Sequence, residues 1–125
     1  MIYAVLDPNN GTVTFASAGH LSPLLVDSKG ASFLETDAGL LLGIFECEFS
    51  EREIQMPAGS RLFLYSDGIT EANNSSNDEY GAERLHAHVS NASASVQSLL
   101  DDVNTFAIGF PATDDITVVM VQARE

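Results

Sequence analysis

A short apolar run that passes directly into an acidic turn is the feature that most constrains this chain. Residues 61–65 are mostly apolar, and a turn-forming stretch, residues 57–60, precedes them. Such a run is too short for a helix and predicts a buried strand. Asp67 follows this strand, and Gly68 would let the backbone turn sharply, which would hold the carboxylate at the rim of a sheet. Asp67 is therefore a candidate metal ligand, although Ser, Asp and Gly are also the residues that ordinary turns prefer.

A second pair of acids opens the last apolar segment. Asp114 and Asp115 directly precede residues 116–121, which are rich in β-branched and other apolar side chains. If the two strands are antiparallel neighbours, the end of the first lies beside the start of the second, and Asp67 and Asp114 face each other. Like charges so placed repel each other unless a cation lies between them. The two strand ends together predict one metal site.

Composition supports a single domain over residues 1–125 and narrows the kinds of ligand. The hydrophobic fraction is 45%, enough for a core of its own. Eighteen Asp and Glu against five Lys and Arg give a formal net charge of −13, which would repel nucleic acid. With so few basic groups, the chain would have to hold phosphate through metal ions.

The sequence favours a cytoplasmic location. Cys47 is the single cysteine and cannot form an internal disulfide. The sequence starts with no basic leader followed by an apolar run, and no stretch approaches the roughly 20 apolar residues of a membrane span. We therefore expect no membrane segment in this chain.

Periodicity predicts an α+β fold in which helices cover antiparallel strands. Alternating segments separated by turn residues predict two hairpins and a further strand over residues 49–56. Apolar residues at helical spacing predict two helices. The hairpins comprise residues 2–6 with 12–17 and residues 23–26 with 31–34, and the helices comprise residues 80–89 and 95–107.

Five segments of the chain carry a resemblance to a known family: residues 18–25, 42–43, 65–72, 80–85 and 114–117. In this order along the chain, they resemble the bacterial metal-dependent serine/threonine phosphatases of the 2C type (PPM). The branch they resemble is the sporulation stage II E and sigma-factor-regulation type. This resemblance implies an αββα sandwich of antiparallel sheets and helices. The family's Gly-Asp-x-x-Gly-His motif, whose aspartate bridges two metal ions, does not occur here, so the chain resembles the C-terminal portion of such a domain and the sandwich is expected to be N-terminally incomplete.

The resemblance also implies a chemistry and a set of roles. Two Mg²⁺ or Mn²⁺ ions would activate a water molecule that attacks the phosphorus of a phosphoserine or phosphothreonine. Asp67 and Asp114 would be metal ligands, and Asp115 and Gly68 would support them. The substrate would be a phosphoprotein of bacterial signal transduction, such as an anti-sigma-factor antagonist. Residues 38–44 would form a loop that packs under the site.

Gly19 and His20 are further candidates at the end of the second predicted strand. The small residues that precede His20 allow close approach of the backbone. The resemblance implies that His20 lies near the metal centre and supports it. The alternative is a histidine that only fixes a loop through hydrogen bonds.

Other functional classes remain open at this point. Without the bridging aspartate, this chain is expected to be inactive alone, and it could be a non-catalytic module that binds a regulatory protein. A metal-free α+β domain with unrelated turn acids is a third alternative. Strands that lack their neighbours would leave unpaired edges, which predicts a homodimer.

Overall fold

The computed structural model describes residues 1–37, 41–112 and 114–124. Two hairpins and two further strands come first, then three helices and a last strand. Their bounds are β1 (Ile2–Asp7), β2 (Thr12–Ser17), β3 (Leu24–Asp27), β4 (Gly30–Phe33), β5 (Arg52–Gln55), β6 (Arg61–Tyr65), α1 (Asp67–Thr70), α2 (Gly81–Val89), α3 (Val96–Phe106) and β7 (Val118–Gln122).

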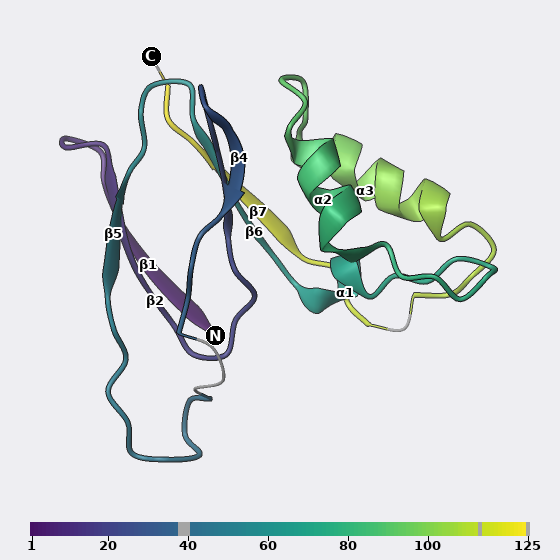
Figure 1. The fold of residues 1–125 in the computed structure, drawn as a ribbon, viewed down its shortest axis with the longest axis horizontal. Helices are drawn as coiled ribbons and strands as arrows, with labels where there is room; N and C mark the ends of the chain where they lie inside the picture. Colours follow the sequence, from purple (N-terminus) through teal and green to yellow (C-terminus); the bar gives the residue numbers. More distant parts are fainter. Residues whose placement is uncertain (38–40, 113, 125) are drawn as a thin grey trace.

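The strands form two separate antiparallel sheets (Figure 1). One has the order β1-β2-β5 and the other the order β4-β3-β6-β7. Both predicted hairpins are confirmed, with Ile2 paired to Ser17 in the first and Leu24 paired to Phe33 in the second. The second hairpin joins β6, far along the chain, so β2 and β3 belong to different sheets although they follow one another in sequence.

Side chains on the two faces of β6 belong to two different hydrophobic cores. Leu62 is buried with Val13 and Met56 in a core that joins the two sheets. Its neighbours Phe63 and Tyr65 belong to the larger core, which includes residues of the helices. Because successive side chains of a strand point to opposite faces, one strand serves both cores.

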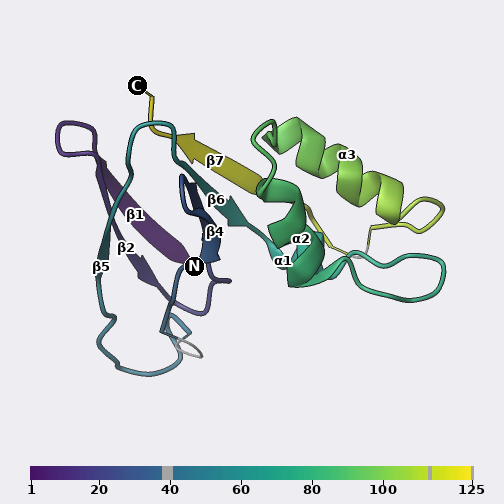
Figure 2. The ribbon, with the colours of Figure 1, turned by 45° about the horizontal axis from the view of Figure 1, so that its top comes forward.

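Helices α2 and α3 pack on one face of the four-stranded sheet (Figure 2). Leu85 of α2 and Leu99 of α3 are fully buried there. The N-terminus of α3 is closed by a capping box, in which the side chains of Ser95 and Ser98 each accept a hydrogen bond from the other's backbone N–H, at 3.1 and 2.9 Å. Both predicted helices are confirmed to within one residue at either end. Within the described parts of the chain, no helix has the length and apolar character to cross a membrane.

The described residues therefore stack as sheet, sheet and helices. On the outer face of the three-stranded sheet, Tyr3 and Val5 are 67% and 54% exposed, and no described helix covers them. The predicted α+β class and the incomplete αββα sandwich are confirmed. The outer face of this sheet is the one that lacks its helical layer.

Two predictions about the loops and strand ends need correction. The strand predicted over residues 49–56 is shorter, because only Arg52–Gln55 pair with β2. Residues 38–40 of the predicted loop lie outside the described residues. Leu41, Leu42 and Ile44 are at least half exposed, so the prediction that this loop packs under the site is wrong for the part that is described. The described part of this loop lies between β4 of one sheet and β5 of the other, and none of its residues belongs to either core.

Candidate metal site at the end of strand β6

Three segments of the chain meet where β6 ends. β6 runs antiparallel to both β3 and β7, and its last residue, Tyr65, pairs with Val118, the first residue of β7. The starts of β3 and β7 therefore lie at the same end of the sheet as the end of β6. This confirms the predicted pairing of the two acidic strand ends and brings residues 114–117 beside the turn after Tyr65.

Ser66 ties the two acidic segments together. Its backbone N–H donates to the carbonyl of Thr117 at 2.9 Å, and its hydroxyl accepts from the N–H of Thr117 at 2.9 Å. The same hydroxyl donates to the carbonyl of Asp115 at 3.1 Å. A single serine thus satisfies three backbone groups of the segment that carries Asp114 and Asp115.

Gly68 is required here for a reason that differs from the one predicted from the sequence. Gly68 lies in α1 and is not among the glycines with a left-handed backbone, so it does not serve to turn the chain sharply. A Cβ atom built at this position would overlap the carbonyl oxygen of Asp115 and lie 3.0 Å from its carbonyl carbon and 3.4 Å from the carbonyl oxygen of Asp114. The absence of a side chain therefore lets α1 lie directly against the backbone of the second acidic segment.

The carboxylates of Asp67, Asp114 and Asp115 are exposed at this end of the sheet. Asp67 is the first residue of α1, and its carbonyl accepts from the Thr70 hydroxyl at 3.2 Å, which fixes the backbone behind it. Oδ1 of Asp114 accepts the N–H of Asp115 at 2.7 Å, which orients that carboxylate. Exposed carboxylate oxygens on backbone held this way suit a hard, hydrated cation such as Mg²⁺ or Mn²⁺.

The described residues do not form a complete set of metal ligands. Across residues 1–37, 41–112 and 114–124, no three His, Cys, Asp or Glu side chains are grouped so that they could hold a metal ion. Asp67, Asp114 and Asp115 share one end of the sheet but do not form a closed cluster. Their roles as ligands stay predictions.

His20 and Gly19 lie on the segment that leads into β3. Gly19 is exposed with φ = 66°, as a turn at the end of β2 requires. Nδ1 of His20 lies 2.7 Å from the carbonyl oxygen of Leu21, and its backbone N–H donates to the Ser17 hydroxyl at 3.2 Å. These contacts fit the loop-fixing alternative for His20, and its support of the metal centre stays a prediction.

The Tyr65 hydroxyl joins this loop to β6. It donates to the carbonyl of Ser22 at 2.9 Å, and burial raises the pKa of Tyr65 to about 12. Tyr65 and Ser66 were not predicted as positioning residues, because Ser66 was assigned to a turn and Tyr65 to the core. Their adjacency to a candidate ligand at a strand end was the only signal.

Comparison with known proteins assigns this chain to a family. The profile of the family described as stage II sporulation protein E (SpoIIE) matches residues 1–124. Protein IcfG of Synechocystis is 25% identical over 126 residues, which cover 97% of this chain and 20% of IcfG. The phosphoserine phosphatase RsbU of Bacillus subtilis is 33% identical over 73 residues, which cover 57% of this chain and 22% of RsbU. This chain thus spans about a fifth of the length of either curated relative.

Solved structures share the fold. The SiaA-PP2C domain of Pseudomonas aeruginosa superposes with a TM-score of 0.81 at 18% identity, over 97% of this chain and 50% of that one. The RsbU and RsbW domains of Rv1364c from Mycobacterium tuberculosis give 0.74 at 28% identity, over 98% of this chain and 35% of that one. RsbX in complex with magnesium gives 0.66 at 16% identity, over 92% of this chain and 51% of that one.

Proposed function

Because this chain belongs to the stage II sporulation protein E family, we propose that it forms the C-terminal part of a metal-dependent phosphatase domain that acts on phosphoserine or phosphothreonine in a protein. The observation that carries the proposal is the link made by Ser66, which holds the segment of Asp114 against the strand end that presents Asp67. The name of RsbU, a phosphoserine phosphatase, supports the same reaction.

Asp67 and Asp114 would hold one Mg²⁺ or Mn²⁺ ion, with Asp115 in support. Their oxygen donors match the preference of these ions, and RsbX, which shares the fold, was solved in complex with magnesium. When bound, the ions would supply an activated water molecule and offset the charge of the phosphoryl group. The residues of this chain contribute the fixed positions: Ser66 and Gly68 set how closely the two acidic segments approach each other.

Two of the chain's four arginines, Arg61 and Arg84, are engaged in the fold. Arg61 is buried, and its guanidinium donates to the carbonyls of Val89, Asn91 and Ala94 at 2.7 to 3.3 Å. The guanidinium of Arg84 donates to two backbone carbonyls and lies over the Phe106 ring. Both guanidinium groups serve the fold, so neither is free to clamp a phosphate.

A pair of ions needs a further ligand that these residues do not provide. With no cluster of three candidate ligands among the described residues, this chain would bind metal weakly and have little or no phosphatase activity by itself. A carboxylate from outside residues 1–125 would complete the site. The substrate would be a phosphoprotein of a regulatory pathway, with an anti-sigma-factor antagonist as one example.

The incomplete ligand set also favours a second candidate function. The same fold would serve as a non-catalytic module that binds a regulatory protein, with Asp67 and Asp114 retained without turnover. The two functions differ in one measurable respect, since only the phosphatase requires both carboxylates for hydrolysis.

Substitution of the two carboxylates tests the proposal in the encoded protein, including any residues beyond this chain. Asp67→Asn and Asp114→Asn should each abolish Mn²⁺-dependent hydrolysis of a phosphopeptide. Glu83→Gln removes an exposed acid on α2 and should leave hydrolysis unchanged. Wild-type turnover in either aspartate variant at saturating Mn²⁺ would refute the assignment. Absence of hydrolysis in the unmodified protein, with binding of a phosphoprotein retained, would support the non-catalytic module.

A further inference from the structure

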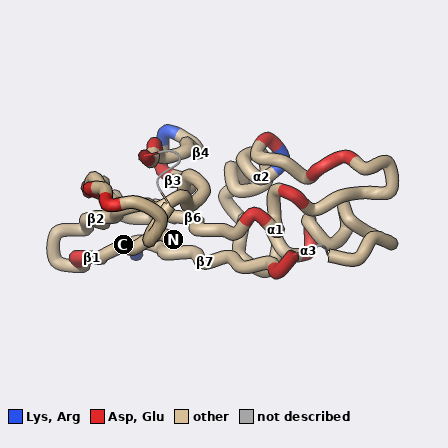
Figure 3. The backbone as a smooth tube through the Cα atoms, turned by 90° about the horizontal axis from the view of Figure 1, so that it is seen from below, with Lys and Arg blue, Asp and Glu red and all other residues tan. Residues whose placement is uncertain are grey.

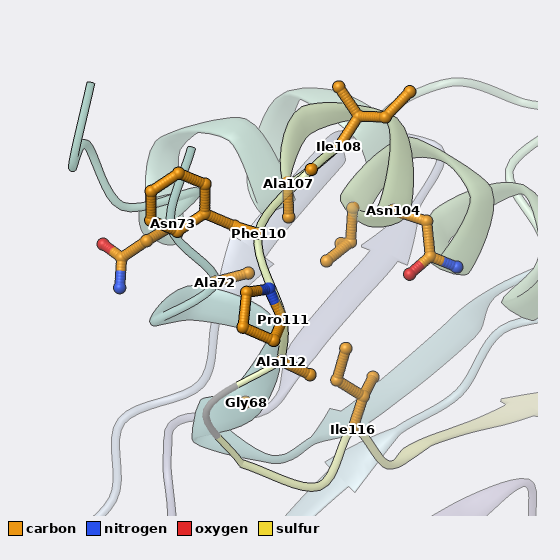
Figure 4. Close-up of a pocket in the computed structure, with 12 residues that line it drawn as sticks. Gly68, Ala72, Asn73, Asn104, Ala107, Ile108, Phe110, Pro111, Ala112 and Ile116 are labelled. Carbon is orange, nitrogen blue, oxygen red and sulfur yellow. The ribbon is translucent and has the colours of Figure 1, made fainter. Parts of the chain in front are cut away.

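A small cavity lies directly beside the candidate metal site. It is lined by residues of α1, the C-terminal end of α3, residues 107–112 and Ile116 (Figure 4). Its volume is about 270 Å³. A cavity of roughly 150 Å³ holds benzene, and pockets for drug-sized ligands begin near 300 Å³, so this one accommodates a single large side chain.

The cavity carries no charge in a strongly acidic chain. The described residues that line it are apolar apart from two carboxamides, although the chain has 18 Asp and Glu and a net charge of −13. Val103, Phe110 and Ile116 supply the larger apolar groups. Asn73 and Asn104 lie on opposite sides of the cavity (Figure 4). An apolar interior with hydrogen-bonding groups at two sides suits an apolar side chain whose backbone remains at the rim.

Backbone hydrogen bonds hold the walls in place. The N–H of Ala107 donates to the carbonyl of Val103 at 3.0 Å, and the N–H of Phe110 donates to the carbonyl of Ala107 at 2.9 Å. On the opposite wall, the carbonyl of Ala72 accepts from the N–H of Tyr80 at 2.8 Å. The cavity is therefore preformed, which lowers the entropic cost of filling it.

The position of the cavity ties it to the candidate metal ligands. Gly68 and Ile116 line it, and they directly follow Asp67 and Asp115 in the chain. An extended peptide advances roughly 3.3 to 3.6 Å per residue. If one side chain of a bound peptide occupies the cavity, peptide residues a few positions away would lie over the carboxylates of Asp67 and Asp115.

We propose that this cavity binds a large apolar side chain, such as leucine, methionine or phenylalanine, of the phosphoprotein substrate, within about three residues of the phosphorylated side chain. The inference rests on the proposed function. The phosphoryl group carries a charge of about −1.5 to −2 and is repelled by an acidic protein. Burial of an apolar side chain does not depend on charge. It would therefore stabilise the complex although the negative charges of the chain repel the phosphoryl group. Figure 3 shows how few basic segments accompany the acidic ones around the fold.

Paired phosphopeptides test the proposal. The two peptides of a pair would be identical except at one position, where one carries leucine and the other the nearly isosteric asparagine. That position would be varied over the three residues on either side of the phosphoserine. Affinity for the encoded protein would be measured by fluorescence anisotropy with divalent metal chelated, and its kcat/KM would be measured with Mn²⁺. We expect the leucine peptide to be favoured by about tenfold at one position or more.

Variants that fill the cavity supply the decisive comparison. Ala112→Leu and Ala72→Leu place a larger side chain in its lining and should remove the preference for leucine. Ala87→Leu, at an exposed position of α2 outside the lining, should keep it. Thermal unfolding of each variant would show that it is folded, and Ala112, which is exposed, tolerates a larger side chain more readily than Ala72.

The outcomes separate this inference from the proposed function. Equal affinity for all paired peptides, or a preference that persists in both filled variants, would overturn the cavity assignment even if hydrolysis is observed. A change of sedimentation in the filled variants without a change in peptide preference would mean that the cavity holds a second copy of the chain, which also overturns it. If the preference is present in binding but no protein hydrolyses the peptides, the cavity assignment stands and the phosphatase proposal fails.

Discussion

The hydroxyl of Ser66 accepts a hydrogen bond from the backbone N–H of Thr117 at 2.9 Å, across 51 positions of the chain. With its donation to the carbonyl of Asp115 at 3.1 Å, this contact continues the pairing of β6 and β7 beyond the last residue of β6 and before the first residue of β7. The relative position of Asp67 and Asp114 therefore depends on a side chain that is not itself a candidate ligand.

Removal of this hydroxyl should loosen the site. Ser66→Ala leaves the N–H of Thr117 and the carbonyl of Asp115 without these partners and should lower the free energy of unfolding by about 1 to 2 kcal/mol. Mn²⁺-dependent hydrolysis by the encoded protein should fall as well, because the segment of Asp114 loses its anchor. Urea denaturation and a phosphopeptide assay would measure the two effects.

A second serine provides the control for that experiment. The hydroxyl of Ser60 is buried and has no hydrogen-bond partner among the described residues, so Ser60→Ala should not destabilise the chain. If Ser66→Ala proves as stable and as active as the unmodified protein, the anchoring role of Ser66 is wrong.

Gly68→Ala should be destabilising through steric overlap. The added methyl group would meet the carbonyl of Asp115, and relief of such overlap in a packed region costs about 1 to 3 kcal/mol. Displacement of Asp115 should also reduce metal-dependent activity. Gly59→Ala is an informative contrast, because its Cβ would meet nothing within 4 Å and its φ of +83° isolates the cost of backbone strain alone. Loss of activity in Gly68→Ala only would support the close-approach role, and unchanged Tm and activity there would contradict it.

Stability should fall at alkaline pH because of two buried tyrosines. Burial raises the pKa of Tyr65 to about 12, and burial together with the hydrogen bond to Asp102 raises the pKa of Tyr80 further. A raised pKa means that the folded state keeps the proton that the unfolded state loses, so this contribution is complete below about pH 10 and is lost as the pH rises toward 12 and above. Tyr65→Phe and Tyr80→Phe should each reduce the slope of unfolding free energy against pH in this range.

Chemical denaturation from pH 8 upward would measure that slope, with Tyr3→Phe, at an exposed position, as the matched control. A slope that does not change in either buried variant would show that other groups govern alkaline unfolding.

We propose that the chain self-associates through β1. Within the described residues β1 pairs only with β2, and Tyr3 and Val5 are exposed on the outer face of the same sheet. A free edge beside an apolar face favours pairing with a second copy, and at physiological salt the Debye length of about 8 Å screens most of the repulsion between two acidic chains.

Sedimentation equilibrium should show a dimer that Val5→Lys weakens. Phe45→Lys changes an even more exposed apolar residue in the loop before β5 and should leave the association unchanged. A single species of 13.4 kDa over a wide concentration range would exclude the dimer.

For the loop predicted over residues 38–44, the sequence did not predict the exposure of the described residues. Its apolar residues resembled a segment packed under the site, yet Leu41, Leu42 and Ile44 are at least half exposed. Hydrophobicity predicts that a side chain gains from burial, but only the arrangement of the two sheets decides whether a partner surface is present. Gly68 shows the same limit: its type was noted, whereas its contact with Asp115, 47 positions away, arises from packing.

The sequence by itself determined the order of the hairpins, the strands and the two longer helices, and placed acids at the two strand ends. Those features depend on side-chain spacing of two to four residues and on turn residues, which are local properties of the chain. The tertiary structure decided that β3 joins β6 and not β2, that Ser66 and Gly68 set the approach of Asp67 to Asp114 and Asp115, and that a cavity opens beside them. These depend on register and contact between segments about 40 to 50 residues apart, where many local sequences are compatible with more than one pairing and packing selects one of them.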